Sequence, residues 1–208
     1  MNDCSSAPPP TALRSAITPD FDSLESFLAA VDARVESILS DPALGEAQGA
    51  ALLGSLVEHR QRRTNALADP LAMFYLLARA HDRPVGALGE RVGAGLLLYF
   101  FALRLIDKVQ DDELAGTPYA PLGRDVATNC GLTLFFLATH ELRAAGTFAG
   151  SQATARALDE LVHFHSLRSS RGQYLDLVGA DEPLTPGEAL ALARMKSSVF
   201  SMFCEAAA

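Results

Sequence analysis

The stretch VGAGLLLYFFALRLIDKVQDDELAG, Val92–Gly116, decides the fold class of this chain. Its first fifteen residues are nearly all apolar, and four acidic residues follow within two helical turns. If one helix begins near Val85 and continues through Asp112, its first part is buried and its end presents Asp107 and Asp111 on one face. Carboxylates avoid burial unless something pairs with them, and a DxxxD pattern by itself is more often a solvated helix end than a ligand pair for a divalent cation such as Mg²⁺. Both interpretations stay open at this point.

The rest of the chain has a helical pattern. Apolar residues recur at spacings of three and four from Phe21 to Ile38, which predicts an amphipathic helix from Asp22 onward. Alternating β-branched runs are absent, so the sequence predicts an all-α domain of long helices. Residues 1–19 are rich in Pro, Ser and Ala and are predicted to form a flexible N-terminal tail. Further helices are expected at about 45–60, 69–81, 85–114, 121–145, 152–178 and 186–206.

The composition argues against several classes of protein. The 208 residues include 17 Lys and Arg against 25 Asp and Glu, a formal net charge of -8, which does not favour nucleic-acid binding. Cys4, Cys130 and Cys204 lie far apart without CxxC spacing, which suggests neither a zinc site nor a disulfide framework. No segment is typical of a targeting sequence or a membrane span, so we expect a cytoplasmic protein without stable membrane insertion.

Three further stretches carry polar residues in a suggestive pattern. EHRQRRTNAL, Glu58–Leu67, concentrates arginines, whose guanidinium groups suit phosphate oxygens. RGQYLDLVG, Arg171–Gly179, places Gln173 and Asp176 on one helix face, and RMKSSVF, Arg194–Phe200, sets a lysine and two serines on an otherwise apolar helix. Taken alone, each stretch is more typical of an ordinary solvent-exposed helix face than of a binding site.

Together and in this order, these stretches resemble the trans-polyprenyl diphosphate synthases, the polyprenyl synthetase family of isoprenoid synthases. EHRQRR resembles the basic motif GGKRxRP, and DKVQD at Asp107–Asp111 resembles the first DDxxD motif. GQYLDL at Gly172–Leu177 fits GQxxDL, and Lys196–Ser197 resembles the KT pair. The resemblance, from about Glu58 to the C-terminus, implies a bundle of long antiparallel helices around a central cavity. Residues 20–208 would then form the N-terminal and central portion of an isoprenoid synthase domain.

The resemblance also implies the site and its chemistry. Asp107 and Asp111 would hold Mg²⁺, with Asp112 as a further ligand, and the metal would bind the diphosphate of an allylic substrate. Lys196 would neutralise charge on the leaving diphosphate and would be catalytic together with Asp107 and Asp111. The residues that the resemblance assigns to diphosphate binding are Arg60, Arg62, Arg63, Gln173, Lys196 and Ser197.

The chain departs from the family pattern at several points. Lys108 replaces the second aspartate of the first motif, LAG stands at Leu114–Gly116 where the family has RRG, and the GGK before the basic motif is missing. The chain ends at EAAA, before any second DDxxD, so the sequence is expected to be a fragment or a truncated protein.

Three functions follow from this pattern. The leading one is a prenyltransferase that condenses isopentenyl diphosphate with an allylic prenyl diphosphate, as farnesyl or geranylgeranyl diphosphate synthases do, by Mg²⁺-dependent ionisation. The missing RRG favours a second function, a terpene cyclase-type or head-to-head isoprenoid synthase. Lys108 and the absent second motif favour a third, a non-catalytic regulatory subunit. A homodimer is expected, because Gly131–Leu142 is richer in large apolar residues than one buried stripe requires.

Overall fold

The computed structural model describes residues 21–63, 69–179 and 183–208. Over these ranges the chain forms eight α-helices and two short 3₁₀ helices and has no β-strand, which confirms the all-α prediction. The flexible tail predicted at residues 1–19 lies outside the described residues. None of the described helices is both long enough and apolar enough to cross a membrane.

The order of the elements agrees with the predicted pattern. The elements are α1 (Leu24–Leu39), η2 (Pro42–Leu44), α2 (Glu46–Arg62), α3 (Pro70–Ala80), α4 (Ala87–Gln110), η4 (Ala120–Leu122), α5 (Arg124–Phe148), α6 (Gln152–Val178), α7 (Pro186–Lys196) and α8 (Ser198–Ala207).

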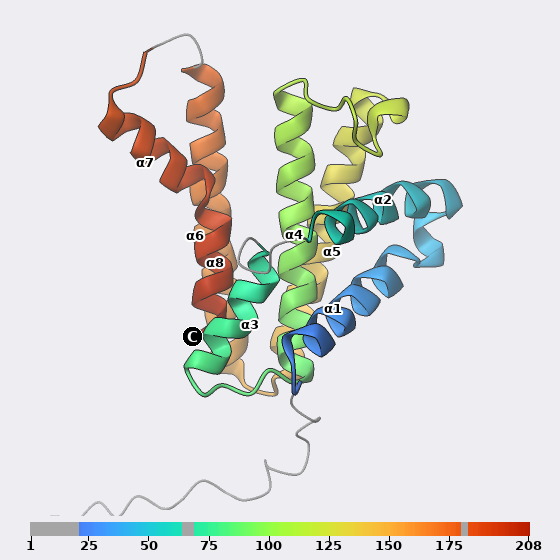
Figure 1. Cartoon of the computed structure of the whole chain (residues 1–208), viewed down its shortest axis with the longest axis vertical. Coiled ribbons are helices and arrows are strands. Elements are labelled where there is room, and N and C mark those ends of the chain that lie inside the picture. The colour runs from blue at the N-terminus through green and yellow to red at the C-terminus, as the bar shows by residue number, and fades with distance from the viewer. Residues whose placement is uncertain (1–20, 64–68, 180–182) are drawn as a thin grey trace, which may run out of the picture.

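Helices α4, α5 and α6 run along the long axis of the molecule, each antiparallel to the next (Figure 1). The pair α4 and α5 makes the largest helix contact, and α1 also packs on α4. Helix α3 packs against α8, and α7 and α8 pack against α6. The consequence is that the second half of α6 and the α7–α8 junction face the end of α4.

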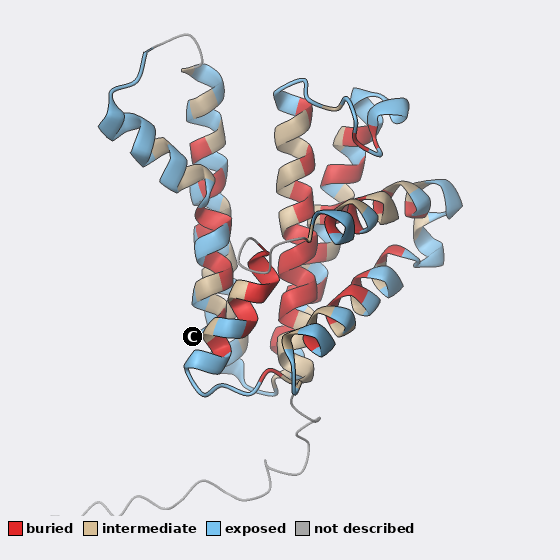
Figure 2. Ribbon diagram, viewed as in Figure 1, coloured by how far each residue is buried: buried red, intermediate tan, exposed pale blue. Residues whose placement is uncertain are grey.

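The apolar run on α4 forms the centre of the core (Figure 2). Leu96, Leu97 and Leu98 are fully buried, and Tyr99 is nearly so. Gly95 permits the close approach of α5, because a Cβ there would lie 2.6 Å from Cγ of Leu142. The burial predicted for the first part of this helix is therefore observed, and it fixes the direction in which the acidic end projects.

The predicted helix 85–114 is shorter than expected and ends at Gln110. Asp111 is its C-cap residue, and Asp112 adopts a left-handed conformation with φ 59°. The backbone N–H of Glu113 donates to the carbonyl of Lys108, as in a Schellman closure. The negative end of the helix dipole disfavours further acidic residues, so the run of acids ends the helix that the prediction extended through Asp112.

The single helix predicted at 186–206 is in fact two helices that meet at Ser197. The hydroxyl of Ser197 donates to the carbonyl of Ala193, a bond of the kind that bends helices, and Ser198 is held by a hydrogen bond to His165. The break turns α8 along α6 (Figure 1). Lys196 is the last residue of α7 and so lies at this corner.

Candidate functional site

A cavity of about 600 Å³ lies between the end of α4, the second half of α6 and the α7–α8 junction. Its walls are largely apolar, and its polar residues come from three helices that the chain supplies far apart in sequence. The apolar lining residues are Phe100, Leu103, Ile106, Tyr174, Leu177, Val199 and Phe200. The polar ones are Arg104, Asp107, Gln110, Ser169, Ser170, Gln173, Lys196 and Ser197. Four residues that the sequence assigned to one site thus line one cavity: Asp107, Gln173, Lys196 and Ser197.

The ammonium of Lys196 joins the carboxylates of two helices. Nζ lies 3.6 Å from Oδ1 of Asp107 on α4 and donates a hydrogen bond to Oδ2 of Asp176 on α6. Burial alone would lower the pKa of Lys196, but the bond to Asp176 and the charge of Asp107 raise it above its ordinary value. The lysine is therefore charged at neutral pH, and it is partly accessible from the cavity.

Asp111 lies one helical turn beyond Asp107, as predicted for residues four apart, and its backbone N–H donates to the carbonyl of Asp107. Partial burial, followed by the negative charge of Asp107, raises the pKa of Asp111 above its ordinary value. The charge of Lys196 acts in the opposite direction and does not fully compensate. The two aspartates thus repel each other, and a cation placed between them would relieve that repulsion.

The donor set fits a magnesium ion that arrives with a phosphate ligand. Among the residues described, no three His, Cys, Asp or Glu side chains group closely enough to hold a metal by themselves. Mg²⁺, however, is usually bound by one or two carboxylates together with water and substrate phosphates. Asp107 and Asp111 supply such a pair. Asp111, at the C-cap of α4, and Asp112, the third proposed ligand in the turn that follows, are both exposed, and neither lines the cavity.

Helix α6 approaches the lysine closely at Gly172. A Cβ at this position would lie 2.6 Å from the backbone nitrogen of Lys196, so only glycine allows this contact. The neighbouring Gln173 lines the cavity, and its Nε2 is buried without a hydrogen-bond partner among the described residues. One turn earlier, Ser169 is 4% exposed, and its hydroxyl is also unpartnered in the described part of the chain. The cavity wall therefore offers two unused hydrogen-bonding groups.

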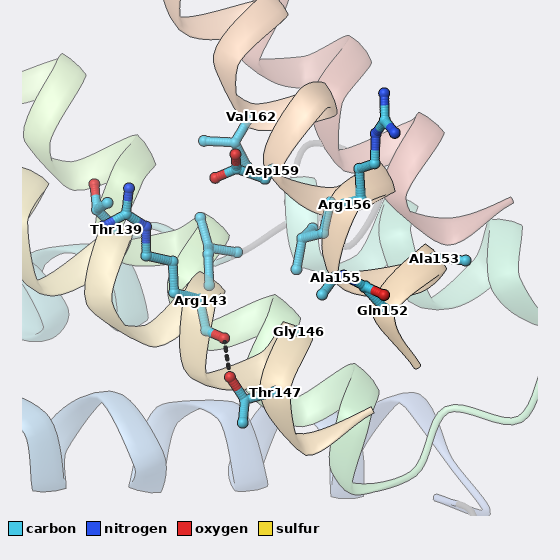
Figure 3. A pocket seen from close by; sticks show the side chains of 12 residues that line it. Thr139, Arg143, Gly146, Thr147, Gln152, Ala153, Ala155, Arg156, Asp159 and Val162 are labelled. Carbon is cyan, nitrogen blue, oxygen red and sulfur yellow. Dashed lines mark hydrogen bonds between the residues drawn. The ribbon is translucent and has the colours of Figure 1, made fainter. Parts of the chain in front are cut away.

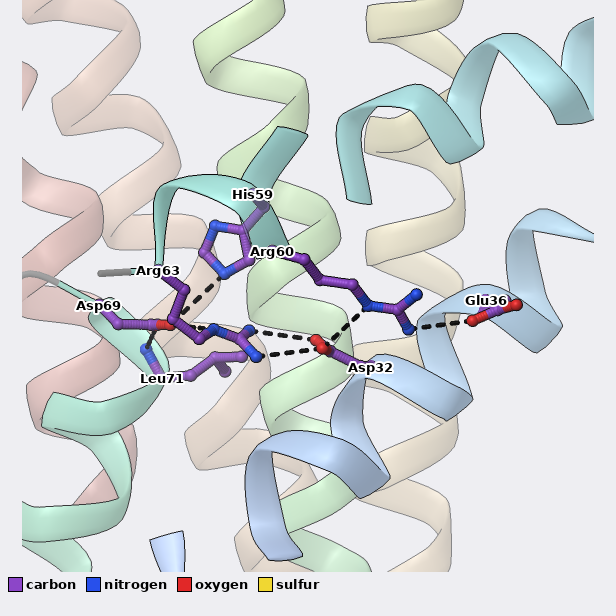
Figure 4. Close-up of polar contacts among 7 residues, drawn as sticks. All are labelled: Asp32, Glu36, His59, Arg60, Arg63, Asp69 and Leu71. Atoms are coloured by element: carbon purple, nitrogen blue, oxygen red, sulfur yellow. Dashed lines mark hydrogen bonds and ion pairs between the residues drawn. The ribbon is translucent and has the colours of Figure 1, made fainter. Parts of the chain in front are cut away.

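The arginines of the basic stretch do not act as one group. Arg63 binds Asp32 through two nitrogens and Asp69 through Nε at 2.5 Å, and Arg60 binds Asp32 and Glu36 (Figure 4). Neither arginine lines the cavity. The expectation that Arg60 and Arg63 point at a diphosphate is thus not met in this structure, because buried carboxylates of α1 and of the start of α3 hold both guanidinium groups.

Arg62 faces a different neighbour from the other two arginines. Its Nη2 lies 2.8 Å from Oε1 of Glu58, and the same oxygen accepts a hydrogen bond from Nη2 of Arg104 at 2.9 Å. Arg104 lines the cavity, so Arg62 is connected to it through Glu58. Sequence reasoning missed Arg104, although a single charged residue inside an apolar run is the signal that could have identified it.

A second cavity of about 830 Å³ lies between α5 and the first half of α6 (Figure 3). Its charged residues are Arg143, Arg156 and Asp159, and all three are exposed. Arg156 pairs with Glu160 on its own helix. The cavity at Lys196 differs in having an ion pair between two helices and two buried, unpartnered polar side chains among its described lining residues, so it is the stronger candidate site.

Sequence comparison provides no relative for this chain: no family model matches it, and no curated protein does. The candidate site therefore rests on the geometry of its own residues.

Proposed function

We propose that this chain is a Mg²⁺-dependent prenyltransferase, which ionises an allylic prenyl diphosphate and joins it to isopentenyl diphosphate. The observation that carries the proposal is the position of Lys196, at 3.6 Å from Asp107, on the rim of a largely apolar cavity. An apolar chain with an anionic head matches such a cavity in shape and polarity. The overall bundle would then be of the isoprenoid synthase type.

Asp107 and Asp111 would hold the metal, and the metal would supply charge to the leaving diphosphate when it is bound. The ammonium of Lys196 donates hydrogen bonds to the same leaving group and neutralises part of its charge. Fixed charges of this kind, in a site from which water is excluded, typically contribute about 3–4 kcal/mol each to transition-state stabilisation. Phe100, Leu103 and Phe200 line the hydrocarbon part of the cavity and exclude water from the allylic cation.

A second candidate function is ionisation without isopentenyl diphosphate, followed by cyclisation or head-to-head joining. The specific observation in its favour is that Arg60 and Arg63 already bind Asp32 and Asp69 and do not line the cavity. Neither arginine is then free to hold a second diphosphate. A test with and without isopentenyl diphosphate separates the two candidates.

The proposed enzyme would be a cytoplasmic homodimer. Phe136 and Leu132 on α5 are 67% and 48% exposed, and both belong to the apolar stretch expected to form the dimer contact. Large apolar side chains that face solvent in this way are typical of surfaces that another chain covers.

Release of diphosphate from an allylic substrate, measured with and without Mg²⁺, tests the proposal. We expect Asp107→Asn to reduce release by a factor of about 100 or more, because it removes the charge of one metal ligand. Asp112→Asn is the matched control, since asparagine also tolerates the left-handed conformation at this position. If the wild-type protein in the presence of Mg²⁺ releases no diphosphate, whether or not isopentenyl diphosphate is added, the proposal is refuted. Release that needs no isopentenyl diphosphate would favour the second candidate.

A further inference from the structure

One face of α6 lies against the corner at which α7 meets α8. Its residues recur at spacings of four, three and four, and they are His165, Ser169, Gly172 and Asp176. Asp176 accepts a hydrogen bond from the Lys196 ammonium, and Gly172 lies directly against the backbone nitrogen of Lys196. His165 also contacts the corner, although it belongs to none of the motifs in the sequence.

His165 holds the first residue of α8. Its Nδ1 lies 2.7 Å from Oγ of Ser198, and the two residues are 2% and 1% exposed. On the other side of the ring, Nε2 lies 3.3 Å from Oε2 of Glu205 but makes no hydrogen bond within the described residues. The Glu205 side chain is 58% exposed, so solvent weakens this pair. The hydrogen bond to Ser198 is therefore the stronger polar link between the imidazole and α8.

The local structure around Lys196 does not by itself fix the start of α8. Helix α7 contains no buried residue, so its own packing contributes little to the position of Lys196 at its end. The N-cap residue Ser197 makes no side-chain capping bond, and its hydroxyl donates back to the carbonyl of Ala193. Apolar burial holds α8 against α3 and α6, but apolar contacts are not directional. The bond between His165 and Ser198 supplies that direction, two residues after Lys196.

We propose that His165 is a positioning residue for the proposed reaction: through Ser198 it holds the α7–α8 corner from which Lys196 reaches the diphosphate. The proposal rests on the proposed function, in which Lys196 donates to the leaving group. Neither His165 nor Ser198 lines the cavity, so His165 acts without touching the substrate. A displacement of about 1 Å at a reacting group can lower a rate by about 100-fold, which is why a bond outside the cavity matters for the reaction.

The mobility of the Lys196 side chain tests the positioning role without any substrate or metal. Lys108 and Lys196 are the two lysines of the chain, so NMR of the whole chain with ¹³C-labelled lysine reports on these residues alone. The order parameter of the Lys196 side chain should fall in His165→Gln and in Ser198→Ala, while that of Lys108 stays as in the wild type. His163→Gln, at an exposed position of the same helix, is the matched control and should change neither lysine.

Two conservative variants separate the roles of the two ring nitrogens. Asparagine places its amide near the position of Nδ1 and can still bond to Ser198, whereas glutamine places its amide nearer to Nε2 and Glu205. His165→Asn should therefore keep the Lys196 side chain ordered, and His165→Gln should not. Glu205→Gln removes the charge beside Nε2 and leaves the bond to Ser198, so it should also keep Lys196 ordered.

The rate of diphosphate release from an allylic substrate with Mg²⁺ connects this role to catalysis. His165→Gln should lower the rate by about tenfold or more, because the ammonium is no longer held in place. In a Lys196→Gln background the same substitution should have no further effect, because the donor that His165 positions is already absent. A purely structural role predicts the same factor in both backgrounds, and that result in an active enzyme would contradict the proposal.

The NMR measurement also decides the question if the protein is not an enzyme. A Lys196 side chain that is as ordered in His165→Gln and Ser198→Ala as in the wild type would overturn the positioning role. An equal loss of order in His163→Gln would do the same. Ser198→Ala breaks the same bond from α8, so it carries the test even if His165→Gln fails to fold. If the wild type releases no diphosphate, the proposed function fails, while the order of Lys196 still shows whether His165 positions it.

Discussion

The ammonium of Lys196 lies 3.6 Å from Oδ1 of Asp107, and this pair connects the α7–α8 break to the last turn of α4. Asp176 on α6 accepts a hydrogen bond from the same ammonium. Three helices therefore meet at one cation, and the position of that cation depends on the break at Ser197. A diphosphate bound through a metal to these acids would therefore lie next to the Lys196 ammonium.

Replacement of Lys196 should change metal binding and catalysis in opposite directions. In Lys196→Gln the carboxylates of Asp107, Asp111 and Asp176 lose their shared cation, so we expect the free protein to bind Mg²⁺ more tightly. Diphosphate release should fall by about 100-fold, because the leaving group loses a donor. Calorimetry with MgCl₂ and the release assay measure the two effects. Weaker Mg²⁺ binding in this variant would show that the acids do not form the metal site.

The repulsion between Asp111 and Asp107 should be visible in the pH dependence of stability. Partial burial and the charge of Asp107 raise the pKa of Asp111 above its ordinary value of 3.8. The folded state therefore favours the protonated form, and this stabilisation is present below pH 3.8 and is lost as the pH rises through the folded-state pKa. At pH 7, Asp111→Asn should be more stable than the wild type by a few tenths of a kcal/mol, as for other like-charged pairs four residues apart.

Thermal unfolding at pH 7 and at pH 3 measures this difference. The advantage of Asp111→Asn should disappear at the lower pH, where the wild-type carboxyl is itself neutral. Millimolar Mg²⁺ together with inorganic diphosphate should stabilise the wild type more than the variant, because the variant lacks one ligand charge. A variant that is less stable than the wild type at pH 7 would mean that Asp111 has a favourable partner.

The buried ion pairs of Arg63 should contribute more to the free energy of unfolding than the more exposed pairs of Arg60. Arg63 is 15% exposed and binds Asp32 and Asp69, whereas Arg60 is 39% exposed and shares Asp32 with Arg63. Arg63→Gln should lower the free energy of unfolding by about 3 kcal/mol, as expected when one partner of a buried pair is removed. Arg60→Gln should cost about 1 kcal/mol or less. Urea unfolding measures both.

The acid sensitivity of the same cluster gives a check on this assignment. Burial would raise the pKa of Asp69, but the neighbouring His59 and Arg63 lower it below its ordinary value. The resulting stability is present above the unfolded-state pKa and is lost as the pH falls through the lower folded-state pKa. The cost of Arg63→Gln should therefore shrink in strong acid. If Arg63→Gln instead weakened diphosphate binding without a loss of stability, Arg63 would be a ligand residue after all.

The sequence predicted those parts of the fold that depend on local pattern. Helix 152–178 was predicted with the bounds that the structure shows, because its flanking residues interrupt the helical pattern at both ends. The prediction placed the end of α4 too late. The spacing of the acids is compatible with a helix and carries no information about the helix dipole or about the left-handed turn at Asp112. The break at Ser197 was not predicted, and the hydrogen bond that holds Ser198 next to it comes from His165, 33 residues away, where local pattern gives no signal.

The sequence could predict those residues of the candidate site that belong to recognisable motifs. The order of the motifs assigned Asp107 and Lys196 to one site, and the structure places them 3.6 Å apart. Helix periodicity by itself could not predict that distance. The partners of Arg60 and Arg63 could not be predicted, because Asp32 lies on another helix and about 30 residues earlier in the chain. A run of arginines indicates excess positive charge, but only tertiary contacts decide which carboxylates take it up.

Two buried serines near the cavity should respond differently to the same substitution. Ser198 is 1% exposed and shares a 2.7 Å hydrogen bond with Nδ1 of His165, while the 4% exposed Ser169 has a hydroxyl without a partner in the described chain. Ser198→Ala leaves a buried imidazole nitrogen unpaired, so we expect a loss of about 1–3 kcal/mol in the free energy of unfolding. Ser169→Ala removes an unpaired polar group and should cost nothing or stabilise the protein slightly.

Chemical unfolding of the two variants beside the wild type measures this contrast, and the identical change of side chain makes each the control for the other. A loss in Ser169→Ala as large as that in Ser198→Ala would show that the Ser169 hydroxyl has a partner in solution, such as a bound water. In the presence of an allylic diphosphate and Mg²⁺, Ser169→Ala should also retain wild-type affinity, because a hydrocarbon chain offers this hydroxyl no hydrogen bond. Weaker affinity in this variant would instead indicate that the ligand carries an oxygen at this depth of the cavity.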